Sequence, residues 1–226
     1  MLQTVPQIGK FRIIHQEKKR YTFEDYSSQI GNADAALGIW VHKGVINEKL
    51  FEAHPNLKYI AMLGHGFEDF DVEMTRRRGV TITNTIYGDV TIAQYAMALL
   101  MNICHNVTVQ SDYTKTGYWK EKETNPQASY NQLFVPQIEL YQKTMGIIID
   151  EEALLEALES RKVYMAGLDV VANEPPQYQI PLMQSPYTFI TSHIAWQPKA
   201  ARLRAVDLAV KHFRSYLEGM PTSVIN

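Results

Sequence analysis

The residues best suited to acid–base chemistry lie in two short segments of the sequence. His193 follows an expected strand and precedes an expected helix, a position from which an imidazole can act as a general acid or base. Glu174 stands in a turn before two prolines, and its carboxylate could orient the histidine. A structural histidine and an ordinary polar turn are the alternative interpretation of these two segments.

A glycine turn, Gly64-His65-Gly66, directly follows another expected strand. Glycines let the backbone turn sharply and aim amide N–H groups at a ligand, so this turn could bind a carboxylate. Asp169 ends a third expected strand and could face a cleft. A plain structural turn and a capped strand end are the alternatives for these two features.

Composition and charge argue against several other classes of function. The chain has 226 residues, a net charge of −2 and 46% hydrophobic residues, so we expect a globular protein that binds neither nucleic acid nor a membrane surface. No apolar run approaches the roughly 20 residues of a membrane span. The single cysteine, Cys104, fits a reducing compartment, and we expect a cytoplasmic protein. No metal site is predicted, because six histidines show no metal-ligand spacing: His15, His42, His54, His65, His105 and His212.

The elements that must position these residues alternate between short strands and amphipathic helices, which indicates an α/β protein with a largely parallel sheet. Strands are expected at 11–15, 36–41, 57–63, 80–83, 165–171 and 189–191. Helices are expected at 48–53, 71–78, 89–107, 150–161 and 198–218. The last helix should bury one apolar stripe, formed by Leu203, Val206, Val210, Phe213 and Leu217. Residues 111–142 lack clear periodicity and are expected to form an extended arm.

Five segments, taken in order, resemble the D-2-hydroxyacid dehydrogenase family along essentially the whole chain, and its glycerate dehydrogenase (hydroxypyruvate reductase) branch in particular. Residues 57–85, 90–107 and 136–148 resemble its substrate loop, its interdomain helix and the entry into its cofactor domain. Residues 161–176, RKVYMAGLDVVANEPP, look like another family segment, and 189–202, FITSHIAWQPKAAR, are similar to its catalytic histidine segment. The resemblance implies a flavodoxin-like substrate domain of parallel sheet and helices, residues 1–88 with 197–226. Residues 89–196 would then hold the interdomain helix, the arm and a truncated Rossmann-type remnant.

The family resemblance implies hydride transfer between NAD(H) and a small 2-oxo acid such as hydroxypyruvate. His193 would donate the proton to the developing alkoxide, and Glu174 would hold the imidazole and stabilise its charged form. Backbone amides near His65 and Gly66 would bind the substrate carboxylate. Asp169 would face the nicotinamide end of the cofactor.

Two features of the family pattern are missing. The strand expected at 143–149 should lead into a Gly-x-Gly-x-x-Gly turn that holds the pyrophosphate, but it runs directly into a helix that Asp150 can cap. About 80–100 residues are absent, two or three βαβ units at ~30 residues each. The family's catalytic arginine is lost with them, and Arg161, which follows a helix, is not an expected substitute. Glu68-Asp69 also replaces the family's Asp-Asn pair and should weaken substrate binding by repulsion.

These departures predict an impaired enzyme, since losing a preorganised electrostatic group typically costs ~10²–10³ in rate. Two alternatives from other classes stay open: a non-catalytic remnant for small-acid binding or oligomeric assembly, and an internal deletion without a selected function. The segments 143–149, 150–161 and 165–171 could form a minimal βαβ unit. Exposed strand edges are templates for pairing with another chain. We therefore expect a homodimer or a segment-exchanged dimer that uses 89–107 and 111–142.

Overall fold

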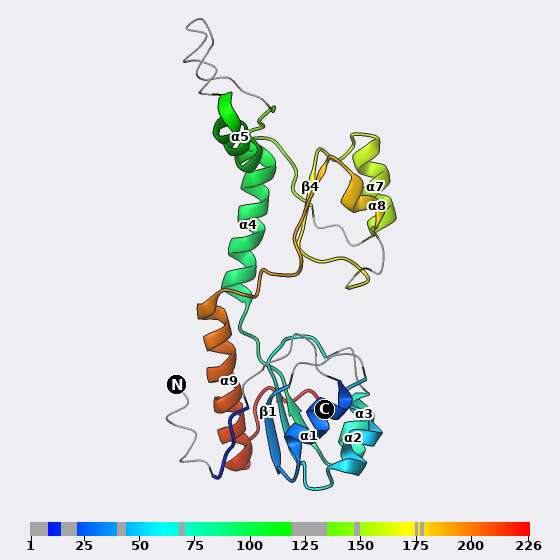
Figure 1. The fold of residues 1–226 in the computed structure, drawn as a ribbon, viewed down its shortest axis with the longest axis vertical. Coiled ribbons are helices and arrows are strands. Elements are labelled where there is room, and N and C mark those ends of the chain that lie inside the picture. The colour runs from blue at the N-terminus through cyan, green and yellow to red at the C-terminus, as the bar shows by residue number, and fades with distance from the viewer. Residues whose placement is uncertain are drawn as a thin grey trace, which may run out of the picture. The chain divides into compact units, whose positions relative to one another are not determined.

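The computed structural model of the chain describes residues 9–14, 22–39, 44–67, 71–118, 135–146, 150–174, 176 and 179–226. The chain divides into two compact units (Figure 1). The first unit combines Met1–Asp89 with Gln197–Asn226, and the second is Val90–Trp196. The first unit is therefore built from two stretches of chain that the second unit separates in sequence.

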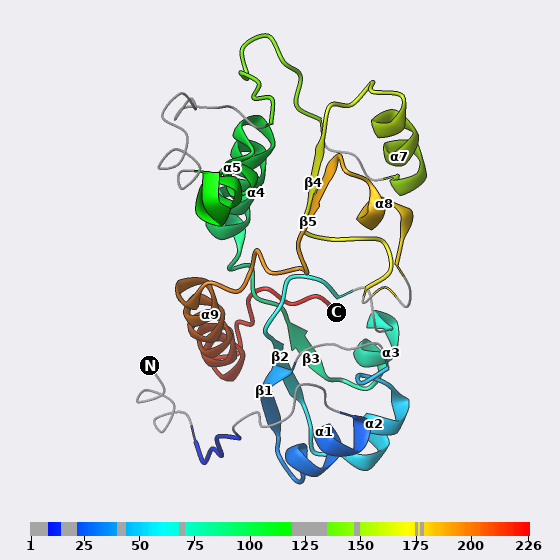
Figure 2. The ribbon, with the colours of Figure 1, turned by 45° about the horizontal axis from the view of Figure 1, so that its top comes forward.

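A parallel three-stranded sheet forms the centre of the first unit. β1 (Ala35–Ile39), β2 (Tyr59–Met62) and β3 (Thr81–Thr83) lie in the order β1-β2-β3. One face is covered by α1 (Phe23–Ile30), α2 (Glu48–Ala53) and α3 (Val72–Arg77), and the other by α9 (Lys199–Leu217) (Figures 1 and 2). Every residue of β2 is buried, as expected for a parallel strand covered on both faces. The predicted α/β class with parallel strands is confirmed.

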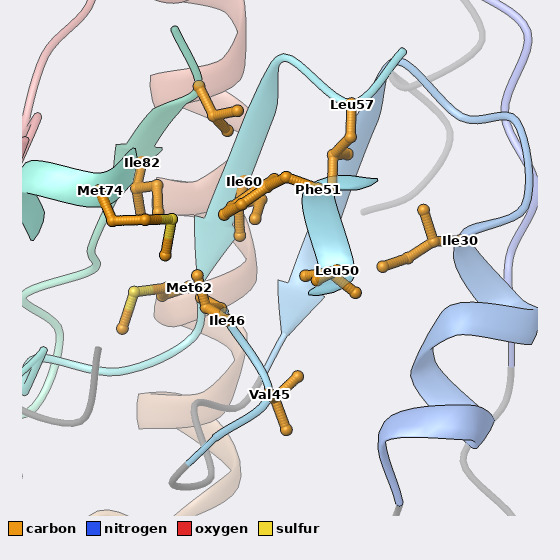
Figure 3. Packing of buried hydrophobic residues seen from close by; sticks show 11 residues of the cluster. Ile30, Val45, Ile46, Leu50, Phe51, Leu57, Ile60, Met62, Met74 and Ile82 are labelled. Carbon is orange, nitrogen blue, oxygen red and sulfur yellow. The ribbon is translucent and has the colours of Figure 1, made fainter. Parts of the chain in front are cut away.

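Alternate residues of the strands divide the two faces of this sheet. Ile60, Met62 and Ile82 belong to the larger core cluster, which includes side chains of α1, α2 and α3 (Figure 3). α2 and α3 begin where the sequence provides caps, because the side chains of Asn47 and Asp71 each accept a hydrogen bond from the backbone N–H three residues on. Both helices confirm the prediction from the sequence.

The opposite face of β2 carries Tyr59, which is fully buried. Its ring centroid lies 5.0 Å from that of Phe213 and 4.7 Å from that of Tyr216, both on α9. Its hydroxyl oxygen lies 2.7 Å from Thr83 Oγ1. Burial raises the pKa of the Tyr59 phenol to about 12, so the ring stays uncharged. This aromatic cluster holds α9 against the sheet.

The buried face of α9 differs from the predicted stripe. Leu203 and Leu217 are 37% and 53% exposed, so the prediction is wrong at both ends of the helix. The residues that α9 buries are small or polar: Ala201, Ala205, Ala209 and His212. Alanines at this spacing let the helix approach the sheet closely, and the aromatic rings fill the space beside them. The face of α9 that is buried is therefore decided by how closely its side chains let the helix approach the sheet, and not by which side chains are most hydrophobic.

A two-stranded parallel sheet forms the centre of the second unit, where β4 (Ala166–Leu168) pairs with β5 (Thr188–Ile190). On one face lie α7 (Glu151–Glu159) and α8 (Pro181–Gln184) (Figure 2). They contact the sheet through a cluster centred on three buried leucines: Leu154, Leu158 and Leu182.

The other face of β4 meets α4 (Asp89–His105) at Gly167. A Cβ atom built on Gly167 would lie 3.0 Å from Leu99 Cβ and 3.2 Å from Ile103 Cδ1, closer than such atoms normally approach. The glycine therefore allows the strand and the helix to come together.

Three predicted elements differ from the structure. A strand is expected at 11–15, but residues 11–14 pair with no described strand and form none. Residue 15 lies outside the described part. The strand expected at 143–149 is absent from 143–146, and 147–149 lie outside the described part, so the observed partner of β4 is β5. The arm expected at 111–142 begins instead as α5 (Val107–Tyr113) and a π-helix at Thr114–Tyr118. Its residues 119–134 lie outside the described part.

Candidate active site

His193 lies in the turn after β5, with its side chain 56% exposed. Its φ of 56° is in the left-handed region, which histidine adopts more readily than most non-glycine residues. The His193 N–H donates to the carbonyl oxygen of Asp169 at 2.8 Å, which ties the turn to the end of β4. The imidazole Nδ1 lies 2.5 Å from Glu174 Oε2. The structure thus brings together the two residues that the sequence predicts as an acid–base pair.

Both oxygens of the Glu174 carboxylate are engaged. Oε2 contacts His193, and Oε1 accepts a hydrogen bond from the Val171 N–H at 2.8 Å. The next residue, Ala172, donates its N–H to Oε1 of Glu151 at 2.5 Å, and Glu151 is the first residue of α7. The segment that carries Glu174 is therefore anchored to a helix. Sequence reasoning misses Glu151, because an acidic residue in the first turn of a helix is common for other reasons.

The contact with Glu174 determines which ring nitrogen of His193 can serve a ligand. With Nδ1 engaged by a carboxylate, Nε2 is the nitrogen left for proton transfer. A carboxylate on Nδ1 also fixes the orientation of the imidazole. The pair can therefore exchange a proton between Nε2 and an oxygen atom of a bound molecule.

Asp169 is joined to the turn that carries His193 by its carboxylate as well as its carbonyl group. Oδ1 accepts hydrogen bonds from the Thr191 hydroxyl at 2.6 Å and the Ile194 N–H at 3.0 Å. Oδ2 accepts one from the Ala195 N–H at 2.9 Å. The structure thus gives Asp169 a structural role around His193, and the expected contact with a cofactor stays a prediction.

The expected carboxylate-binding turn, Gly64-His65-Gly66, follows β2 and belongs to the first unit. His65 and Gly66 are exposed. The Thr85 N–H donates to the carbonyl oxygen of Gly64 at 3.0 Å, which fixes the turn to the segment after β3. A Cβ built on Gly64 would meet no described atom within 4 Å, and its φ lies outside the left-handed region. Neither crowding nor backbone conformation therefore requires a glycine at position 64.

In the sequence, α7 follows the segment that resembles the entry into the family's cofactor domain, and the residues at its N-terminus do not suit a pyrophosphate. Asp150 caps the helix, and its Oδ1 accepts a hydrogen bond from the Ala153 N–H at 2.9 Å. Glu151 and Glu152 add two carboxylates to the same turn. A pyrophosphate would meet like charges and an N–H group that already has a partner. These residues therefore do not fit a dinucleotide bound in the family manner.

Other candidate groups are committed to packing or are not found in the described residues. The Arg161 guanidinium lies 4.1 Å from the ring centroid of Tyr187 and 5.3 Å from that of Tyr164, a cation–π arrangement. Within the described residues, no three or more His, Cys, Asp or Glu side chains are grouped to hold a metal ion. In the same part of the chain, no helix has both the length and the apolar character needed to cross a membrane. Glu68-Asp69 lies outside the described part.

A parallel α/β fold in which a strand end carries a histidine held by a carboxylate occurs in more than one class of enzyme. Comparison with known families specifies which one. Residues 7–226 match the family described as D-isomer specific 2-hydroxyacid dehydrogenase, catalytic domain, and the chain belongs to this family. The resemblance predicted from the sequence is confirmed, and the family includes reductases of hydroxypyruvate and glyoxylate.

Relatives of known sequence and structure agree with this assignment. A hydroxypyruvate reductase from Blautia hydrogenotrophica is 26% identical over 302 residues, which cover 95% of this chain and 91% of that protein. The TT0316 protein from Thermus thermophilus is 20% identical, with a TM-score of 0.75 over 100% of this chain and 96% of that chain. An acyclic imino acid reductase (Bsp5), solved with NADPH and D-Arg, is 15% identical, with a TM-score of 0.72 over 100% and 95%. At these identities the two structures establish the fold.

Proposed function

We propose that this chain binds a small 2-oxo or 2-hydroxy acid, such as hydroxypyruvate, and retains the proton-transfer half of its family's reaction. That reaction is the NAD(H)-dependent reduction of a 2-oxo acid to the D-2-hydroxy acid. The 2.5 Å contact between His193 Nδ1 and Glu174 Oε2 carries the proposal, because it supports a proton donor that is still assembled. Turnover with NAD(H) should be far slower than in the relatives, because the sequence lacks the dinucleotide-binding turn.

In the proposed role, His193 donates the proton on Nε2 to the oxygen that becomes the substrate hydroxyl group. Glu174 orients the ring through Nδ1 and balances the positive charge that the imidazole carries before the transfer. As a separate part of the proposal, backbone N–H groups of His65 and Gly66 in the first unit bind the carboxylate group of a small acid.

We further propose that the chain lacks an internal segment of the family's cofactor domain. The match to the Blautia hydrogenotrophica protein runs over 302 residues, whereas this chain has 226, so at least 76 positions of the match have no counterpart here. Two or three βαβ units at about 30 residues each would account for such a stretch. The size supports a deletion that removed whole structural units together with the dinucleotide-binding turn and the arginine.

Calorimetric titration of the purified chain tests the proposed function. We expect saturable but weak heat with hydroxypyruvate, and no saturable heat with NADH up to millimolar concentration, because the first turn of α7 is acidic and already capped. A hydroxypyruvate reductase that has its complete cofactor domain is the positive control for NADH. Saturation by NADH at micromolar concentration would contradict the proposed loss of cofactor binding. The absence of any heat signal with hydroxypyruvate would contradict binding of the acid and favour an assembly role.

An assembly role is the second candidate function, and the surface of α4 supports it. Val90 and Met97 are 64% and 51% exposed and lie on one side of this helix, seven residues apart. Exposed apolar side chains on one side of a helix can pack against a second chain. We propose a homodimer, or a segment-exchanged dimer, that uses α4 and residues 111–142.

Replacing Met97 by lysine is expected to convert this dimer into a monomer, because an unpaired charge is costly in an apolar contact. Sedimentation velocity at micromolar protein concentration measures the change. Ile92→Lys is the matched control, because Ile92 is 52% exposed and lies about 140° around the helix from Met97. A wild-type monomer, or a dimer unaffected by Met97→Lys, would disprove the proposed contact.

We also propose that the protein acts in the cytoplasm. Its one cysteine, Cys104, is free and buried. A reducing compartment suits a protein that has no partner for a disulfide within its own chain.

A further inference from the structure

Two consecutive carbonyl groups of the turn after β2 are held from the same side. The Thr85 N–H donates to the carbonyl oxygen of Gly64 at 3.0 Å. The Asn84 side chain donates from Nδ2 to the carbonyl oxygen of His65 at 2.8 Å. Neighbouring residues after β3 thus fix two neighbouring peptide groups of the turn.

This arrangement determines where the next two amide groups point. In a planar trans peptide the C=O and the following N–H point in opposite directions. With the carbonyl groups of Gly64 and His65 directed at residues 84–85, the N–H groups of His65 and Gly66 are directed away from them. No described residue accepts a hydrogen bond from either N–H. Two adjacent amide donors aimed the same way suit a carboxylate.

Asn84 is itself held firmly, so it can serve as a fixed support. It is only 6% exposed, and its backbone N–H donates to the carbonyl oxygen of Ser223 at 3.3 Å. Thr83, which precedes Asn84, forms an antiparallel bridge with Val224, which follows Ser223. The Ile225 N–H donates to the carbonyl oxygen of Ile82 at 3.0 Å, which extends this pairing.

We infer that Asn84 is a positioning residue for carboxylate binding: by holding the His65 carbonyl group, it keeps the Gly66 N–H directed at the ligand. The inference rests on the proposed function, in which this turn binds the carboxylate of a small acid. Asn84 does not touch the ligand, so its effect passes entirely through the peptide group between His65 and Gly66.

Asn84→Asp provides the test, because a carboxylate has nearly the same shape as the amide but repels the His65 carbonyl oxygen. The ¹⁵N-labelled protein is titrated with hydroxypyruvate, and the amide signals of His65 and Gly66 are followed by NMR. We expect both signals to shift in the wild type and the affinity to fall about 10- to 100-fold in Asn84→Asp, as for loss of one hydrogen bond to a charged group. Asn84→Ala, which removes the donor without adding charge, should weaken binding in the same direction if Asn84→Asp does not fold.

Asn106→Asp is the matched control for loss of stability. Asn106 is 3% exposed, and its Nδ2 donates to the Pro136 carbonyl oxygen at 2.9 Å, so the same change removes a comparable hydrogen bond in the other unit. This control should keep the wild-type affinity for hydroxypyruvate. Equal affinity in wild type and the Asn84 variants would overturn the positioning role and leave the carboxylate site intact. No shift of His65 and Gly66 in the wild type would overturn both.

Discussion

Replacing Asp169 by asparagine is expected to lower the free energy of unfolding of the second unit by about 3–5 kcal/mol and to separate His193 from Glu174. The Asp169 carboxylate accepts three hydrogen bonds from the turn that carries His193. An asparagine keeps one oxygen and places an NH₂ group against a backbone N–H donor. Hydrogen bonds to a charged acceptor contribute about 1.5–3 kcal/mol each, so the loss is large.

The geometry of His193 explains why the effect should reach the acid–base pair. Its φ of 56° is less favourable than ordinary backbone angles for a residue with a Cβ atom, so the surrounding contacts help to hold it. Without the Asp169 carboxylate, the turn can relax toward ordinary backbone angles, and Nδ1 then leaves the Glu174 oxygen.

Urea unfolding followed by NMR of the second unit measures the stability change, and the imidazole signals of His193 report its contact with Glu174. Asp150→Asn is the matched control, because Asp150 also accepts a backbone hydrogen bond, at an N-cap where asparagine serves nearly as well as aspartate. If Asp169→Asn were as mild as Asp150→Asn, the carboxylate of Asp169 would not be what holds the turn.

Replacing Gly167 by alanine should destabilise the second unit by about 1–3 kcal/mol, because it overfills a closed contact. The added Cβ would lie 3.0 Å from Leu99 Cβ, an atom attached directly to the backbone of α4 that a change of rotamer cannot move. β4 would have to move away from the helix, and part of its contact with Leu99 and Ile103 would be lost.

Thermal or urea unfolding measures this change, and Gly146→Ala is its control in the same unit. A Cβ on Gly146 would meet no described atom within 4 Å, and its φ lies outside the left-handed region, so that variant should stay within about 0.5 kcal/mol of the wild type. A Gly167→Ala protein as stable as the control would mean that β4 and α4 do not pack as closely as the structure shows.

Elements marked by local signals could be predicted from the sequence. The cap predicted at Asp150 correctly indicates where α7 begins, and the helices predicted at 48–53 and 71–78 are observed as α2 and α3. Strand pairing depends on contacts between distant residues and could not be predicted, so the partner of β4 differs from the expected one. The buried face of α9 also depends on a distant partner, the aromatic ring of Tyr59, which makes small residues the better fit.

The same distinction, between features that local sequence signals mark and features that depend on distant contacts, applies to the candidate site. His193 and Glu174 could be proposed because their side-chain types suit acid–base chemistry and the family pattern marks them. Glu151, Asn84 and the structural role of Asp169 could not, because these side chains act on backbone groups whose positions depend on the tertiary structure. No spacing in the sequence marks a side chain that bonds to a peptide group in another segment.

The position of α9 in the chain has a consequence for folding during synthesis. The last residue of β3 is Thr83, and the helix that covers the Tyr59 face of the sheet begins at Lys199. At ribosomal rates of about 5–20 residues per second, the ribosome needs on the order of ten seconds to make the intervening chain. Throughout that time the Tyr59 face of the sheet lacks the helix that covers it in the folded protein, so we expect this apolar surface to be open to a molecular chaperone. The first unit can therefore close only after residues 199–217 have left the ribosome.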